Sequence, residues 1–229
     1  MDHDRNAPPL NPLPVIVWVL ALPLIAVELL VSLAEAGLVG GASGIGWRLQ
    51  AVERFAMFPS VLRQQVEAGG HPYVDLLRLV SYPLVHGSVT HAVFALVILL
   101  ALGKMVGENF RWWGVVVVVL AATVAGALVY GLAIPAQRVP LIGAYPPVYG
   151  LIGAFTYLMW TNPGLVGGNK YRAFSMIGVL LTLQLVFGVV FGADWTWVAE
   201  VTGFLAGFLT SFIASPGGFR QLLALIRQR

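Results

Sequence analysis

The sequence contains no cysteine and little charge. Without cysteine the chain has no disulfide, no thiolate metal site and no cysteine nucleophile. Only 10% of its 229 residues are charged, whereas a soluble domain needs roughly a quarter to present a wetted surface. The net charge of +3 is scattered along the chain without a dense basic run, which excludes nucleic acid as a partner. The surface must therefore face an apolar medium, and the expected partner is the lipid bilayer.

The sequence has several long hydrophobic runs. Hydrophobic residues make up 59% of the chain, and the mean hydropathy is +0.85. Several runs reach the roughly 20 residues that cross a hydrocarbon core, and in lipid such runs must be helical because no backbone group can stay unpaired. We predict an all-α membrane protein whose six transmembrane helices span residues 13–33, 85–106, 112–134, 144–160, 173–191 and 197–214.

The expected organisation is a membrane domain between two short tails. Residues 1–12 form a polar, proline-rich tail, 13–214 the membrane domain and 215–229 a basic tail. The first apolar run is long enough to span and follows an acidic flank, so we expect a retained helix and not a cleaved signal. Lys and Arg in the short loops place both termini in the cytoplasm. We expect the membrane to be the bacterial inner membrane.

A long extracytoplasmic loop, residues 35–84, is predicted between the first two spans. Its stretch from Trp47 onward places Trp47, Val52, Phe55 and Phe58 along one side and charged residues elsewhere. Such an amphipathic segment is too polar to span. It lies either in the membrane interface or as a helix that caps the bundle.

Glycines recur at helical spacing in several predicted spans. Small residues four apart allow membrane helices to approach closely, so the pattern predicts tight packing. The pairs four apart are Gly103/Gly107, Gly188/Gly192 and Gly203/Gly207, and Gly150 with Gly153 is three apart.

The segment from Arg78 to Phe110 resembles the rhomboid intramembrane proteases. Active rhomboids carry Trp-Arg, then His-x4-His-x3-Asn entering the second helix, then Gly and Glu near its end. The matching positions here are Arg78, His86, His91, Gly103 and Glu108. The Trp position is Leu77, and the Asn position is Ala95.

Two further segments resemble the rhomboid fourth and sixth helices. The fourth opens on Gly-x-Ser-Gly, and the matching positions are Gly143, Tyr149, Gly150 and Gly153. The nucleophilic serine position is Tyr145, and the glycine after it is Pro146. In the sixth helix Gly203 and Gly207 match, whereas the general-base histidine position is Glu200. The resemblance covers almost all of 13–214 and implies a six-helix rhomboid-like bundle.

The departures from the family pattern argue against proteolysis. Tyr145 places a phenol with an ordinary pKa near 10 where a small hydroxyl should attack, and its ring fills the space of a scissile carbonyl. Pro146 has no backbone N–H, and Ala95 lacks a side-chain donor for an oxyanion. We therefore expect a pseudoprotease with no catalytic residue, metal or cofactor, which binds transmembrane helices of other membrane proteins.

Three alternatives remain open at this point. The chain is an active intramembrane peptidase with unorthodox residues, a transporter or proton pathway that uses Glu28 and Glu200, or a structural subunit of a larger complex. Carboxyls inside a span usually face the bundle interior with a partner. For Glu200, placed near a helix centre, the fold suggests a hydrogen bond with Tyr145.

Two other features suggest chemistry but have simpler interpretations. His86 and His91 are five residues apart and so share no helix face as metal ligands at i, i+4 would. Capping or water-bridged hydrogen bonds explain them better. The sequence Gly41-Ala42-Ser43-Gly44 imitates the rhomboid serine motif, but it lies in the first loop with no spanning helix behind it. We interpret it as a turn.

Overall fold

The computed structural model describes residues 12–68, 76–134, 139–162, 164, 167–191 and 195–218, and within these ranges it is helical, with one isolated β-bridge between Met57 and Leu141. The helices are α1 (Val15–Glu35), α2 (Gly41–Gly44), α3 (Trp47–Phe55), α4 (Pro59–Ala68), α6 (Arg78–Ser81), η1 (Tyr82–Leu84), α7 (Val89–Gly107), α8 (Trp112–Ala133), α9 (Tyr145–Thr161), η3 (Lys170–Phe174), α10 (Ser175–Phe191) and α11 (Trp197–Ala214). The predicted all-α class is confirmed.

A long helix stands at each of the six predicted positions. Four of them, α1, α7, α8 and α11, are long and apolar enough to cross a membrane. The other two, α9 and α10, have 17 residues each, about 25 Å at 1.5 Å per residue, and lie at the short end of what spans about 30 Å of hydrocarbon. The count of six spans therefore stays a prediction.

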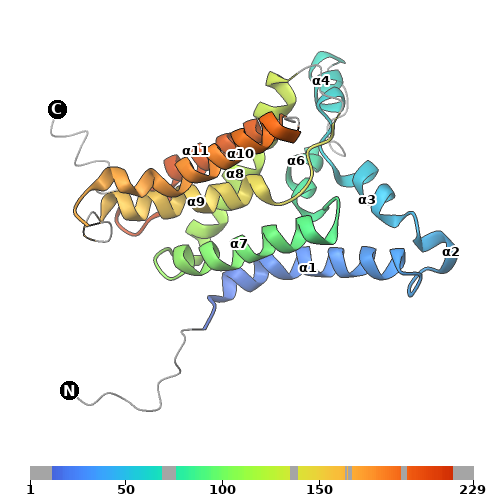
Figure 1. The fold of residues 1–229 in the computed structure, drawn as a ribbon, viewed down its shortest axis with the longest axis horizontal. Coiled ribbons are helices and arrows are strands. Elements are labelled where there is room, and N and C mark those ends of the chain that lie inside the picture. The colour runs from blue at the N-terminus through green and yellow to red at the C-terminus, as the bar shows by residue number, and fades with distance from the viewer. Residues whose placement is uncertain are drawn as a thin grey trace, which may run out of the picture.

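Helix α9 is central to the bundle (Figure 1). It packs against α7, α8 and α11, while α1 lies alongside α7 at one edge. Between Pro146 and Tyr157 every α9 residue except Phe155 is buried. The helices of the first loop, α2 to α4, gather at the end of the bundle where α7, α9 and α11 begin. We call this end the loop end.

The α9–α11 interface brings two backbones into contact. A Cβ atom on Gly203 would collide with the carbonyl of Pro146, and one on Gly207 would collide with the backbone of Gly150. A Cβ on Gly103 would lie 3.0 Å from the Val17 side chain, which shows the same device between α7 and α1. These contacts agree with the packing interpretation of the glycines. Gly192 lies outside the described residues.

The amphipathic stretch of the first loop is two helices and not the single piece expected. Helix α3 ends at Phe55, Ala56 is extended with ψ 151°, and α4 begins at Pro59. Proline disfavours helical backbone in the residue before it, which separates the two. Met57 and Leu141 exchange backbone hydrogen bonds of 3.1 and 2.8 Å at this break.

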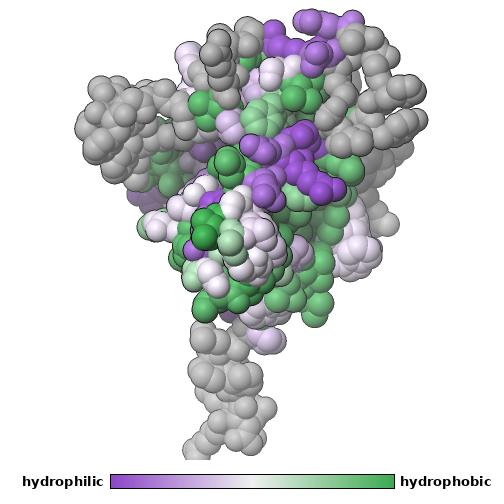
Figure 2. Space-filling view, turned by 90° about the vertical axis from the view of Figure 1, so that its right-hand side faces the viewer, coloured by the Kyte–Doolittle hydropathy of each residue, from purple (hydrophilic) through white to green (hydrophobic). Residues whose placement is uncertain are grey.

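Helix α4 covers the end of α8, as the capping alternative predicted for this loop. The guanidinium of Arg63 donates to the carbonyls of Gly131 and Leu132 in the last turn of α8. Helix α3 packs along α1 and has no buried residue. Figure 2 views the loop end directly, and hydrophilic side chains gather over its middle with hydrophobic side chains on the flanks.

Candidate functional site

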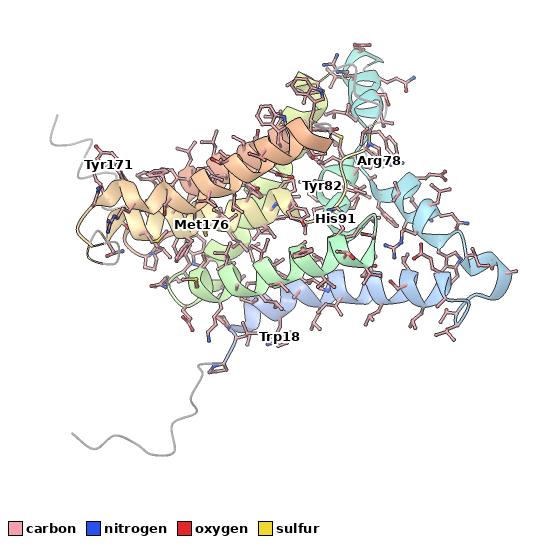
Figure 3. The ribbon with its side chains drawn as sticks, in the orientation of Figure 1. Trp18, Arg78, Tyr82, His91, Tyr171 and Met176 are labelled. Carbon is pink, nitrogen blue, oxygen red and sulfur yellow. The ribbon has the colours of Figure 1, made fainter. Side chains whose placement is uncertain are left out.

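The positions that resemble the rhomboid catalytic residues meet at the loop end. His91 lies in the first turn of α7, Tyr145 begins α9, and Glu200 lies in the first turn of α11. Figure 3 shows His91 at this end, far along the bundle from Tyr171. Three helix starts therefore build the candidate site.

His86 lies in the loop before α7, because this helix begins four residues later than predicted. Ser88 is its N-cap, and the Ser88 hydroxyl accepts a hydrogen bond of 3.2 Å from the backbone N–H of His91. The loop carries the His86 ring back onto His91, edge to face, with centroids 5.2 Å apart. The five-residue spacing of His86 and His91 excluded a shared helix face. The two rings meet because His86 lies in the loop, which folds back onto α7.

The side chain of His86 is 1% exposed and supports the start of α9. Its Nε2 atom accepts a 3.3 Å hydrogen bond from the backbone N–H of Ala144, and its own carbonyl accepts a 2.8 Å bond from Arg48. Burial, with the charge of His91, lowers the pKa of His86 to about 4. The imidazole is therefore neutral near pH 7. Among the described residues no group of three His, Cys, Asp or Glu side chains could hold a metal ion.

Tyr145, at the position that resembles that of the rhomboid nucleophile, has a stacked ring. Its ring lies on that of His91, with centroids 5.1 Å apart and 15° between the planes. Gly143 permits this approach, because its φ is +86° and a Cβ there would lie 2.8 Å from the His91 ring. The space in front of His91 is thus occupied by a phenol.

Glu200 lies in the first turn of α11 and not near the centre of a span as expected. The position suits a carboxyl because the N-terminal end of a helix carries partial positive charge. Glu200 is 8% exposed and interacts with the phenols of both the expected partner, Tyr145, and Tyr149, one turn further along α9. The carboxyl therefore links α11 to α9.

Pro146 and Ala95, at the other positions that resemble rhomboid catalytic residues, contribute apolar surface. Pro146 is buried beneath Gly203 and has no N–H to donate. Ala95 lies one turn after His91 on α7, is fully buried and belongs to the hydrophobic core. Neither residue supplies a donor for a developing oxyanion.

Arg48 is the residue of this region that the sequence did not single out. Its guanidinium lies 2.9 Å from the Glu28 carboxyl and 2.8 Å from the Glu35 carboxyl. Ser32 donates a further 3.0 Å hydrogen bond to Glu28. Arg48 is 20 residues from Glu28, so no helical spacing relates the two. The available signal was a carboxyl inside an apolar helix, which requires a counterion.

The other positions shared with rhomboids have structural contacts. Arg78 donates to the carbonyls of Glu53 and Ala56, at 2.8 Å each, and so holds the end of α3 (Figure 3). Glu108 follows the last turn of α7, at the opposite end from His91, and lies 3.9 Å from Lys104. The stretch Gly41–Gly44, interpreted above as a turn, forms the short helix α2 instead, and the exposed Ser43 hydroxyl donates to the carbonyl of Gly40, the residue before that helix.

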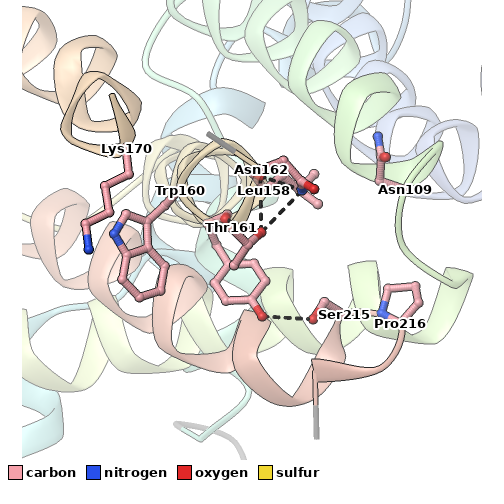
Figure 4. A pocket seen from close by; sticks show the side chains of 9 residues that line it. Asn109, Leu158, Trp160, Thr161, Asn162, Lys170, Ser215 and Pro216 are labelled. Carbon is pink, nitrogen blue, oxygen red and sulfur yellow. Dashed lines mark hydrogen bonds between the residues drawn. The ribbon is translucent and has the colours of Figure 1, made fainter. Parts of the chain in front are cut away.

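A cavity of about 480 Å³ lies at the end of the bundle opposite the loop end (Figure 4). Several of its polar side chains hydrogen-bond nearby helix ends. Asn162 donates to the Leu158 carbonyl at 2.9 Å, Asn109 to the Met105 carbonyl at 2.8 Å, and Ser215 to the Tyr157 hydroxyl at 3.2 Å. Helix capping therefore explains much of the polar lining.

Comparison with known proteins shows the family of this chain. The family model described as the Rhomboid domain matches residues 74–217, which is more than half of the chain. The chain belongs to the rhomboid family. It is an integral membrane protein of that family, and its helical bundle is the expected fold.

Two plant proteins are similar to this chain. RHOMBOID-like protein 5 of Arabidopsis thaliana is 26% identical over 151 residues, which are 66% of this chain and 46% of that protein. RHOMBOID-like protein 4 of Arabidopsis thaliana is 26% identical over 139 residues, 59% of this chain and 33% of that protein. The chain spans less than half the length of either relative.

Proposed function

We propose that this rhomboid homologue does not cleave peptide bonds and instead binds transmembrane segments of other membrane proteins. The observation that carries the proposal is the stack of Tyr145 on His91, at the position of the rhomboid nucleophile. A ring in this place occupies the volume into which a scissile carbonyl must move. The proposed setting is a bacterial inner membrane, with both termini in the cytoplasm.

The groups at the loop end support no nucleophile–base pair of the usual kind. Acyl transfer needs a nucleophile within hydrogen-bond reach of a base, and donors aimed at the oxyanion. The Nε2 atom of His86 accepts from Ala144, and the Nδ1 atom of His91 accepts from Gly87 at 3.4 Å. Glu200 is engaged with Tyr149. Each potential base thus has a partner within the fold.

The outward surface of α7 supports the binding half of the proposal. Val93, Phe94 and Val97 form an apolar stripe, 49%, 60% and 57% exposed. Val97 lies four residues after Val93 and three after Phe94, so it is a neighbour of both on the helix surface, and the stripe offers a continuous contact for a helix in the bilayer. We propose this face of α7 as the binding surface for a client helix.

The first experiment reconstitutes the chain beside an active rhomboid with a single-span rhomboid substrate. We expect no product from this chain while the control cuts normally. A product that disappears in Tyr145→Phe or Glu200→Gln would overturn the proposal. Ser43→Ala removes the exposed imitation of the serine motif, and a product that depends on it would overturn the proposal equally.

The second experiment places a photoactivatable amino acid at Phe94 on α7 and, as a matched control, at Leu209 on α11, which is 61% exposed. After irradiation in membranes, we expect discrete adducts with single-span proteins from position 94 and weaker, diffuse adducts from position 209. Equal adducts from both positions would show lipid-phase collisions only and would contradict a binding surface on α7.

A further inference from the structure

A groove lies between α1, α3 and η1 at the loop end, apart from the histidine pair. Its volume is about 370 Å³, within the range of small-molecule sites. The walls are mainly apolar side chains: Val27, Leu30, Val31, Ala51, Leu84 and Val85. Leu30 is 49% exposed, and its neighbour Leu29 is 56% exposed, so the wall is continuous with the outward surface of α1. In a membrane protein this surface faces acyl chains.

The polar side of the groove is formed by α3. Gln50 and Arg54 are both exposed and one turn apart, and Ser81 faces them from the end of α6. Ser81 donates its hydroxyl to the carbonyl of Phe55 at 2.9 Å, so it fixes the helix end. The groove is therefore apolar along its walls and has amide and guanidinium donors at one side.

Arg54 differs from Arg48 on the same helix. Arg48 is held by the carboxyls of Glu28 and Glu35, whereas Arg54 forms no ion pair with a carboxylate of the described residues. Its guanidinium lies over the Phe55 ring, 5.8 Å from the centroid. A guanidinium that is not paired with a carboxylate can donate its N–H groups to an oxyanion. Its planar geometry suits two parallel hydrogen bonds to a phosphate group.

We propose that this groove binds one glycerophospholipid, with an acyl chain along α1 and the phosphate at Arg54. The positive charge of Arg54 favours binding of the phosphate. The apolar walls, which continue onto the lipid-facing surface of α1, favour binding of the acyl chain. Amphipathic α3 then lies at the depth of the head groups, where such segments are stable. The inference is independent of whether the protein cleaves, binds or ignores other membrane proteins.

The test titrates the delipidated full chain in detergent with dioleoyl phosphatidylglycerol and counts bound lipid by native mass spectrometry. Two variants alter the site: Arg54→Gln removes the positive charge, and Ala51→Phe fills the groove. Two matched controls leave it intact: Arg111→Gln removes an exposed arginine at the start of α8, and Leu49→Phe enlarges a 65% exposed residue on α3 outside the groove.

We expect one tightly retained lipid in the wild type and in both controls. Binding should weaken about tenfold or more in Arg54→Gln, because a charge-assisted hydrogen bond is lost. A comparable loss is expected in Ala51→Phe. Arg54 is exposed, so its substitution tests the site even where Ala51→Phe does not fold.

Two ligand controls identify the source of the phosphate. Dioleoylglycerol, which lacks phosphate, should bind at least tenfold more weakly than phosphatidylglycerol, and glycerol 3-phosphate should not displace the lipid. Equal retention by site and control variants would overturn the proposal. Equal binding of dioleoylglycerol would overturn the role of Arg54, and displacement by glycerol 3-phosphate would show a free phosphate site instead of a lipid site.

Discussion

Helices α9 and α11 are held together by close backbone packing, whereas α1 and α3 are held together by ion pairs. Between α9 and α11, glycines at 203 and 207 place one backbone directly on the other. Between α1 and α3, a single arginine reaches across to two carboxyls of α1. The α9–α11 contact requires glycine, so a larger side chain at 203 or 207 should disrupt it. The α1–α3 contact requires the guanidinium of Arg48, so a substitution that removes this group should disrupt it.

The largest expected effect comes from adding a side chain to the glycine joint. In Gly207→Leu the new side chain meets the backbone of Gly150, which cannot move as a flexible side chain can. We expect a cost above the about 1–3 kcal/mol typical of overpacking, with no monodisperse protein recovered from detergent. Gly178→Leu on α10 is the matched control, since a Cβ there has no atom within 4 Å. Equal recovery of both variants would contradict the backbone contact.

The next effect comes from removing the charge that joins α1 to α3. Arg48→Met leaves the buried carboxyl of Glu28 without its cation. We expect a loss of about 2–4 kcal/mol, somewhat below that of a fully buried pair because Arg48 is 13% exposed, and a fall in Tm of about 5–15 °C. The double variant Glu28→Leu with Arg48→Met should recover much of the loss. If the double variant is no better than the single one, the ion pair is not the source of the effect.

A smaller effect is expected from His86, and it depends on pH. Its folded pKa of about 4 lies below the ordinary 6.5, so folding favours the neutral imidazole. This contribution is complete above pH 6.5 and is lost as the pH falls from 6.5 towards 4. At pH 5 the loss is about 1–2 kcal/mol.

Thermal melting between pH 7.5 and 4.5 measures the contribution of His86. His86→Gln keeps an acceptor for the N–H of Ala144 but does not titrate, so its Tm should fall less steeply than that of the wild type over this interval. Parallel curves for the two proteins would show that other groups cause the whole pH dependence.

The smallest expected effect separates the two tyrosines of α9. Tyr149→Phe removes a hydroxyl that interacts with the buried Glu200 and should cost about 1 kcal/mol. Tyr145→Phe keeps the ring that stacks on His91 and should be nearly neutral. Denaturation of the two variants side by side is the measurement. A larger loss in Tyr145→Phe would show that Tyr145 makes the link to α11 that the sequence suggested.

Most of the fold could be predicted from the sequence because membrane helices follow local rules. Long apolar runs must be helical, and helix starts at 112 and 197 were predicted as observed. The start of α7 was wrong, since hydrophobicity continues through Val85 while Ser88 caps the helix. Pro59 is the sequence signal that divides the amphipathic stretch into α3 and α4.

The candidate site was predicted in its members but not in its contacts. The resemblance placed Tyr145 opposite Glu200, and the starts of α9 and α11 do meet at the loop end, where His91 at the start of α7 joins them. Glu200 reaches Tyr149 as well as Tyr145 because of how far α11 is displaced along α9, since the two phenols lie one turn apart on the same face. Sequence spacing does not specify this displacement, because it is set by which side chains fit between the two helices.

The sequence by itself determined that this protein lies in a membrane and that it is helical, because both follow from residue type and local spacing. Its resemblance to the rhomboids further predicts that the catalytic positions hold other residues. Only the tertiary structure decided that Arg48 neutralises Glu28, that His86 supports the start of α9, and that Tyr145 covers His91. These contacts join residues that are far apart in sequence, and their geometry arises from packing several helices at once.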